Sequence, residues 1–159
     1  MPDEVASYLA TMGRERYRAV IFHSVPAQAQ ALSQFTQRVA ECLNGTYIDL
    51  LSHFLAHTEL AANLDTFGPN ELCTLLVELA VERRLLVVDK VDFLLDTWSK
   101  PELQAFYRLI RLQWDSFTPT MSAILILCLQ RTTELESLDI MDSHKHSRAR
   151  RLEDFQALV

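Results

Sequence analysis

The chain has few glycines, and this scarcity limits what its loops can do. Only 3 of its 159 residues are glycine, whereas glycine makes up about 7% of an average protein. This composition excludes collagen-like, silk-like and linker-rich chains. It also excludes a glycine-rich loop that holds phosphate through bare backbone N–H groups, because Gly13, Gly45 and Gly68 stand far apart in the sequence.

Long apolar runs, paired cysteines and an excess of basic residues are lacking as well. The longest apolar stretch, 121–129, is too short for a membrane helix, which needs about 20 residues. The three cysteines are odd in number, lie far apart and have apolar neighbours, which indicates reduced thiols in a cytoplasmic protein. With 15 basic and 21 acidic residues, the net charge is −6, so the overall field does not steer the protein onto nucleic acid or a membrane.

The remaining composition is that of one folded domain. Hydrophobic residues make up 49% and charged residues 23% of the chain, which is typical of a globular protein. No Pro/Gly/Ser-rich linker and no internal repeat divides the sequence. We therefore predict a single domain over residues 1–159, with a polar tail from about residue 130 to residue 159.

Short apolar runs alternate with segments of helical periodicity. The patterns predict strands at 18–22, 46–51, 85–89 and 123–129, and helices at 3–12, 27–43, 71–84 and 101–117. Asn44 and Gly45 are expected to end the second helix, and Asn70 to cap the third. Strands that are apolar throughout favour a parallel sheet covered on both faces. We predict a three-layer α/β/α fold with a mostly parallel sheet of about four strands.

The carboxyl ends of such strands are where functional side chains gather. The first predicted strand runs through a loop into a helix, the third ends in Asp89, and the fourth ends in the polar Gln130. This order resembles the P-loop NTPase superfamily, in the branch with an extra strand between the Walker A and Walker B strands. The resemblance covers roughly residues 17–131. The alternative is a parallel α/β domain unrelated to NTPases, since a fold does not fix a function.

The signature residues of that family are nevertheless replaced. The family motif G-x-x-x-x-G-K-[ST] can be aligned on the junction between the first strand, the loop and the helix. His23 and Gln28 then stand at the two glycines, Ala29 at the lysine and Gln30 at the Ser/Thr. Pro26 removes one backbone donor, and Lys90 stands where the water-activating Glu is usual. Only Asp89 could still take the Mg²⁺-associated role. The resemblance therefore implies a vestigial nucleotide site formed by these four residues with Asp89 and Gln130, no ATP hydrolysis and no cofactor.

A narrower resemblance rests on the short chain and on the segment 91–96, which follows the third strand with the sequence VDFLLD. It is similar to the small P-loop proteins encoded with bacteriophage-exclusion (BREX) and related anti-phage systems, although those proteins keep an intact P-loop. This implies a non-catalytic structural or regulatory subunit whose partners are other proteins, with self-association left open. Two alternatives stay open: a nucleic-acid-binding accessory protein of the degenerate recombinase-paralogue type, and a nucleotide-binding switch that does not hydrolyse.

Three further clusters are candidates for contact with other molecules. The densest basic cluster could bind nucleic-acid phosphates or could be a solvated tail; it consists of Lys145, Arg148, Arg150 and Arg151. A partner-binding patch, which depends on exposure of the tryptophan, would consist of Trp98, Tyr107, Arg108 and Arg111. His53 and His57 share one helix face, but no third ligand is evident, so no metal site is predicted.

Overall fold

The protein is an α/β fold built on one parallel sheet. The computed structural model describes residues 2–12, 18–112, 124–138, 140–141 and 147–156. Within these residues the sheet has five strands in the order β2-β3-β4-β1-β5, and every pairing is parallel. The strands are β1 (Ala19–Ser24), β2 (Thr46–Asp49), β3 (Leu85–Asp89), β4 (Ile124–Gln130) and β5 (Ala149–Arg151). The predicted fold class is confirmed, whereas the predicted count of four strands is wrong.

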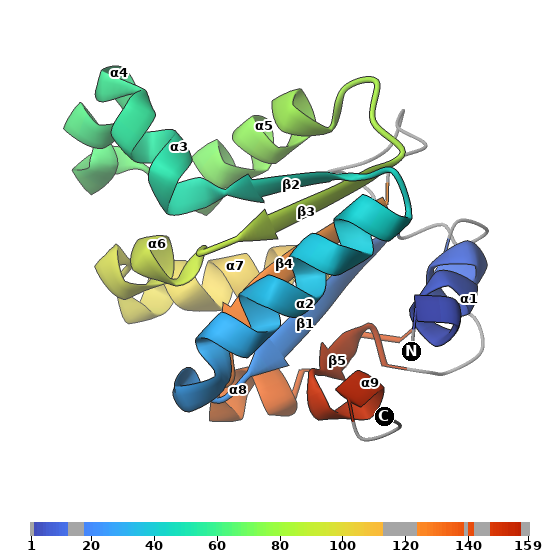
Figure 1. Cartoon of the computed structure of the whole chain (residues 1–159). Helices are drawn as coiled ribbons and strands as arrows, with labels where there is room; N and C mark the ends of the chain where they lie inside the picture. The colour runs from blue at the N-terminus through green and yellow to red at the C-terminus, as the bar shows by residue number, and fades with distance from the viewer. Residues whose placement is uncertain (1, 13–17, 113–123, 139, 142–146, 157–159) are drawn as a thin grey trace.

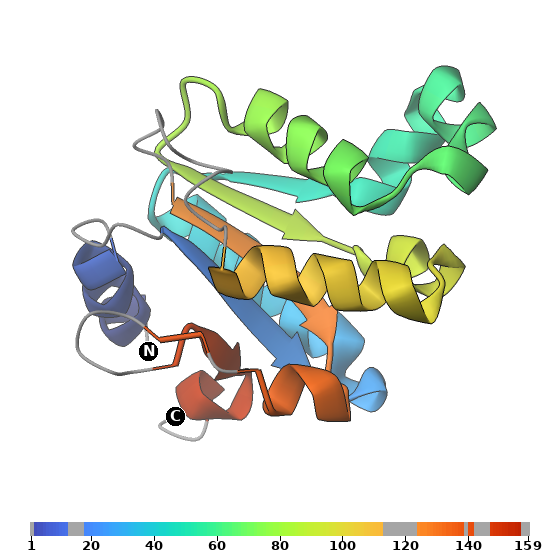
Figure 2. The ribbon, with the colours of Figure 1, turned by 180° about the vertical axis from the view of Figure 1, so that it is seen from behind.

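Helices connect the strands and cover both faces of the sheet (Figures 1 and 2). The α-helices are α1 (Pro2–Met12), α2 (Ala29–Cys42), α3 (Leu50–Ala56), α4 (Thr58–Ala62), α5 (Pro69–Ala80), α6 (Asp92–Thr97), α7 (Lys100–Leu112), α8 (Thr133–Glu136) and α9 (Glu153–Gln156). Two single-turn 3₁₀ helices are η1 (Pro26–Gln28) and η2 (Leu64–Thr66). None of the described helices is both long and apolar enough to cross a membrane.

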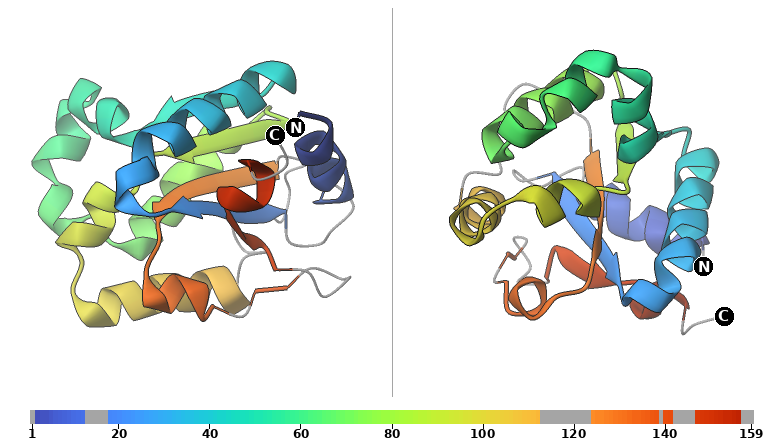
Figure 3. Two further views of the ribbon diagram at one scale, coloured as in Figure 1. Left: turned by 60° about the horizontal axis from the view of Figure 1, so that its bottom comes forward. Right: turned by 90° about the vertical axis from the view of Figure 1, so that its left-hand side faces the viewer.

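The sheet separates two hydrophobic cores, because neighbouring residues of a strand point to opposite faces. Val20 and Phe22 of β1 pack with α1, α2 and α9 on one face. Ile21 packs on the other face, with the core that contains Leu76 of α5 and Phe106 of α7. The right-hand view in Figure 3 shows α2 and α7 on opposite sides of the sheet. Burial on both faces thus explains the apolar runs 19–22, 85–88 and 124–129 within β1, β3 and β4.

The helix boundaries follow local chemistry. After α2 ends, Asn44 has a φ of 55°, and a Cβ on Gly45 would lie 2.8 Å from Cδ2 of Leu85, so this turn requires glycine. The prediction that Asn70 caps α5 is wrong, because Gly68 occupies the N-cap position and Pro69 starts the helix. The Glu71 carboxylate accepts a hydrogen bond from the Gly68 N–H at 3.2 Å.

The described residues of the predicted polar tail, 130–138, 140–141 and 147–156, belong to the folded body. Leu135, Ile140, Leu152 and Phe155 are buried. Strand β5 lies along β1, with Ile21 opposite Ala149, and the Phe155 ring lies 5.0 Å from the ring of Phe22, centroid to centroid. The prediction failed because Ala149–Arg151 has no apolar alternation of its own and becomes a strand only by pairing with β1.

Candidate functional site

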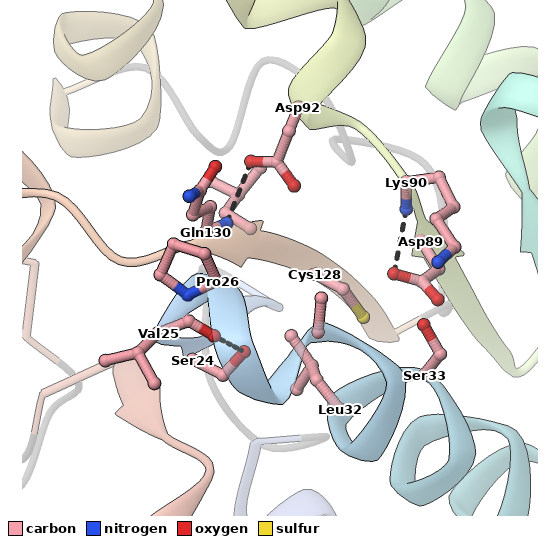
Figure 4. A pocket seen from close by; sticks show the side chains of 12 residues that line it. Ser24, Val25, Pro26, Leu32, Ser33, Asp89, Lys90, Asp92, Cys128 and Gln130 are labelled. Atoms are coloured by element: carbon pink, nitrogen blue, oxygen red, sulfur yellow. Dashed lines mark hydrogen bonds between the residues drawn. The ribbon is translucent and has the colours of Figure 1, made fainter.

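The carboxyl ends of β1, β3 and β4 and the start of α2 border a cavity of about 250 Å³, here called the strand-end cavity (Figure 4). Parallel strands bring their carboxyl ends to one edge of the sheet, so this is where a ligand site is expected. Three of the predicted residues line it: Ala29, Asp89 and Gln130. The other three, His23, Gln28 and Gln30, are not among its lining residues.

The loop between β1 and α2 is wound into the 3₁₀ turn η1, in which two backbone N–H groups donate to carbonyl oxygens of the same loop. The N–H of Gln28 donates to the carbonyl oxygen of Val25 at 2.9 Å, and the N–H of Ala29 donates to the carbonyl of Pro26. Pro26 itself has no N–H. The hydroxyl of Ser24 also donates to the Val25 carbonyl, at 3.1 Å. Two of the N–H groups that would face a phosphate in a P-loop, those of Gln28 and Ala29, are therefore bonded within the turn.

Asp89 is buried at the end of β3, with 4% of its surface exposed. One carboxylate oxygen accepts a hydrogen bond from the Tyr47 hydroxyl, and the other accepts from the N–H of Lys90 at 2.8 Å. Burial and then the neighbouring Asp89 raise the pKa of Tyr47, so its hydroxyl stays protonated and donates. Because Tyr47 belongs to β2, the carboxylate joins two neighbouring strands at the edge of the cavity.

Lys90, directly after Asp89, has a φ of 60°, a left-handed conformation that costs a non-glycine residue free energy. Its N–H bond to Asp89 helps to hold this turn, and its side chain lines the strand-end cavity beside the carboxylate (Figure 4).

Asp92, the first residue of α6, supplies a second carboxylate to the cavity. It accepts from the N–H of Gln130 at 2.8 Å, which fastens α6 to the end of β4. Burial is the largest cause that raises the pKa of Asp92, and the nearby Asp96 and Asp89 add to it. Two carboxylates and the ammonium of Lys90 give the lining a net negative charge, which disfavours a triphosphate. Within the described residues, no group of three or more His, Cys, Asp and Glu side chains could hold a metal ion.

No protein-family model, curated protein or solved structure matches this chain.

The strand-end cavity is also lined by residues that the sequence analysis did not select as site residues, among them Ser33, Asp92 and Cys128. The only signal for Asp92 was its position just after Asp89, beyond the end of an apolar strand. The role of Tyr47 could not be predicted from the sequence. A strand pattern does not tell which residue of a neighbouring strand a side chain contacts, and here Tyr47 of β2 contacts Asp89 of β3.

His23 does not line the cavity. It belongs to a cluster of polar side chains, here called the C-terminal network, that consists of His23, Arg131, Glu136, Arg151 and Glu153. His23 is 2% exposed, and its Nδ1 accepts from Nε of Arg131 at 3.1 Å. Burial, followed by the charges of Arg131 and Arg151, lowers the pKa of His23 to about 4. Arg131 also contacts Glu153 at 2.7 Å, and Arg151 contacts Glu136 at 2.9 Å. The network fastens β5 and α9 to the ends of β1 and β4.

Of the predicted nucleic-acid contacts, one is buried and two pair with carboxylates of the same chain. Arg148 is 2% exposed, so its prediction as a phosphate contact is wrong. The Arg150 guanidinium lies over the rings of Tyr8 and Phe155, 4.8 and 5.1 Å from their centroids, and also contacts Asp154 at 3.5 Å. Arg151 is paired with Glu136 in the C-terminal network. Lys145 lies outside the described residues.

The predicted partner patch does not form as expected either. Trp98 is 7% exposed, and its indole N–H donates to the carbonyl oxygen of Phe67 at 2.7 Å, so the exposure on which the patch depends is not met. Tyr107 is half-buried, with its ring 5.5 Å from that of Phe106, centroid to centroid. Arg108 is exposed, and the side chain of Arg111 lies outside the described part of the chain.

Proposed function

We propose that this protein is a non-catalytic structural or regulatory subunit of a multi-protein complex, with the frame of a P-loop NTPase and a loop that no longer binds phosphate. The observation that carries the proposal is the 3₁₀ turn η1, because Gln28 and Ala29 donate their N–H groups to Val25 and Pro26 within it. A phosphate would find these two N–H groups already bonded, no N–H on Pro26 and no lysine at position 29.

The order of the strands supports the frame. Strand β4 pairs with both β1 and β3, and so it occupies the position that the resemblance assigns to the extra strand between the Walker A and Walker B strands. Asp89 ends β3 as a Walker B carboxylate would, but both of its oxygens accept hydrogen bonds from the protein itself. This supports a role for Asp89 in joining β2 to β3 rather than in holding Mg²⁺.

An exposed apolar pair on α3 supports contact with another protein. Leu51 and Leu55 lie one helical turn apart and are 41% and 70% exposed. We propose a prokaryotic anti-phage defence assembly as the setting, on the resemblance of the sequence alone. The nucleic-acid alternative receives less support, since Arg148 is buried, and the half-buried Arg150 and the exposed Arg151 pair with carboxylates of the same chain.

The test of the nucleotide part is a binding titration with fluorescent ATP and Mg²⁺, run beside a known P-loop ATPase. We expect no saturable binding and no phosphate release in a malachite-green assay. Saturable binding that is lost in Ala29→Glu, which would place a carboxylate among the phosphates, would overturn the proposal. Gln34→Glu is the matched control, because it makes a comparable charge change on an exposed residue of the same helix.

The test of the partner part is a pulldown with the tagged full chain from its native cells, followed by reconstitution with the purified partner. We expect Leu51→Ser/Leu55→Ser to weaken the reconstituted complex. Val81→Ser should leave it intact, since it removes an equally apolar side chain, 56% exposed, at the end of α5. Equal binding by both variants would contradict a role for this pair.

A second candidate, a switch that binds a nucleotide without hydrolysing it, is favoured by one observation. The strand-end cavity lies at the edge of the sheet where α/β proteins bind ligands, and the Lys90 ammonium lines it. The same titration separates the candidates: nucleotide binding that is weakened by Lys90→Gln, with no phosphate release, would support the switch.

A further inference from the structure

Two histidines stand together at the end of α3, and neither lines the strand-end cavity. The rings of His53 and His57 have centroids 4.2 Å apart and planes inclined by 31°. His53 belongs to α3, and His57 is the extended residue that directly follows the helix. Helix α3 begins directly after β2 and, with α4, lies at the upper left end of the sheet in Figure 1, remote from α1 and the C-terminus. His57 is exposed and His53 is half-exposed.

A hydrogen bond fixes which nitrogen of His57 carries the proton. Its Nδ1 lies 2.7 Å from the carbonyl oxygen of His53. Because a carbonyl oxygen only accepts, this bond requires the proton on Nδ1 and leaves the lone pair on Nε2. Histidines that bind metals characteristically donate their second N–H to a backbone carbonyl, which orients the ring and raises its basicity. This arrangement is already in place at His57.

The separation of the two rings suits a shared ion. Two nitrogens bound to one Zn²⁺ at about 2.0–2.1 Å would lie roughly 3–3.5 Å apart. The ring centroids of His53 and His57 lie 4.2 Å apart, so the two imidazoles already stand at a separation of that order.

We propose that His53 and His57 form a two-imidazole site for a borderline divalent cation of the Ni²⁺, Cu²⁺ and Zn²⁺ group, with water or a donor from another molecule completing the coordination. Imidazole suits these ions, whereas Mg²⁺ and Ca²⁺ require oxygen ligands. The site has two protein ligands, fewer than the four of a structural zinc site. Binding is therefore exchangeable and does not hold the fold together.

The test uses the full chain without an affinity tag, stripped of metal by a chelator and titrated calorimetrically with NiCl₂ and with ZnCl₂ at pH 7.5. We expect one equivalent to bind. Outer-shell partners of metal ligands are typically worth about 10–100-fold in affinity, so His53→Gln and His57→Gln, which remove a ligand itself, should each weaken binding at least tenfold. The double variant His144→Gln/His146→Gln, which removes two other histidines, should bind like the wild type.

Two further measurements make the result decisive. Far-UV circular dichroism of each variant checks that the fold is kept. NMR resonances of the His53 and His57 rings should broaden first when paramagnetic Ni²⁺ is added. The proposal is overturned if the wild type binds neither ion, if His53→Gln/His57→Gln binds as tightly as the wild type, or if binding is lost only in His144→Gln/His146→Gln.

Discussion

Lowering the pH from 7 to 4 is expected to remove about 3 kcal/mol of folding free energy through His23 alone. Burial, followed by Arg131 and Arg151, lowers its pKa from 6.5 to about 4 in the folded protein. Each unit of difference between the folded and unfolded states is worth about 1.36 kcal/mol. The unfolded chain thus binds a proton in a pH range where the folded protein does not, and this stabilises the unfolded state as the pH falls.

The folded protein stabilises the neutral form of the His23 imidazole, and this determines the sign of the effect. The imidazole accepts a hydrogen bond from Nε of Arg131, which a protonated ring could not do. The contribution of His23 is therefore complete above pH 6.5 and is lost progressively as the pH falls to about 4. The charges that act on it come from Arg131 after β4, Arg151 of β5, Glu136 of α8 and Glu153 of α9.

Urea unfolding at several pH values between 7.5 and 4 measures this effect. His23→Gln removes the titrating group but keeps a side chain that can accept from Arg131, so its free energy of unfolding should fall less steeply than that of the wild type. His57→Gln controls for the loss of an exposed imidazole and should follow the wild-type curve. If His23→Gln and the wild type lose the same free energy between pH 6.5 and pH 4, the reasoning is refuted.

Three predictions on stability can be measured by urea unfolding at pH 7. Tyr47→Phe removes the donor to the buried Asp89 carboxylate and should cost about 1.5–3 kcal/mol; an unchanged midpoint would mean that this bond does not stabilise the fold. Gly45→Ala would place a methyl group 2.8 Å from Leu85 and should cost about 1–3 kcal/mol. Gly68→Ala should cost less, because its nearest neighbour, at 3.3 Å, is the flexible carboxylate of Glu71, and the reverse order would contradict the packing. Leu127→Ala, at a fully buried position of β4, should cost about 2–5 kcal/mol, and a loss below 1 kcal/mol would show that the core refills the space.

Much of the fold could be predicted because the governing signals are local. The apolar run 85–89 was predicted as a strand and is β3 (Leu85–Asp89). The strand predicted at 46–51 ends earlier, at Asp49, because the Asp49 carboxylate accepts from the N–H of Ser52 at 3.0 Å and starts α3. This boundary depends on which of two local preferences prevails, a β-prone apolar sequence or an N-cap.

The candidate site was predicted only in part, because its contacts join residues far apart in the chain. Ala29, Asp89 and Gln130 do meet at one cavity, since parallel strands necessarily bring their carboxyl ends together. His23 was aligned with them but lies in the C-terminal network, because its side chain points to the sheet face opposite α2. The partner patch required an exposed Trp98, but this side chain is buried and donates to the Phe67 carbonyl of another part of the chain.

By itself, the sequence determined the alternation of strands and helices, the parallel sheet and the absence of glycine and lysine from the loop after the first strand. These follow from periodicity and residue type, which act over a few neighbouring positions. Only the tertiary structure decided that Ala149–Arg151 forms a fifth strand, that Arg148 is buried and that Asp89 bonds to Tyr47. Each of these depends on a partner distant in sequence, and its free energy exists only once the sheet has brought the two segments together.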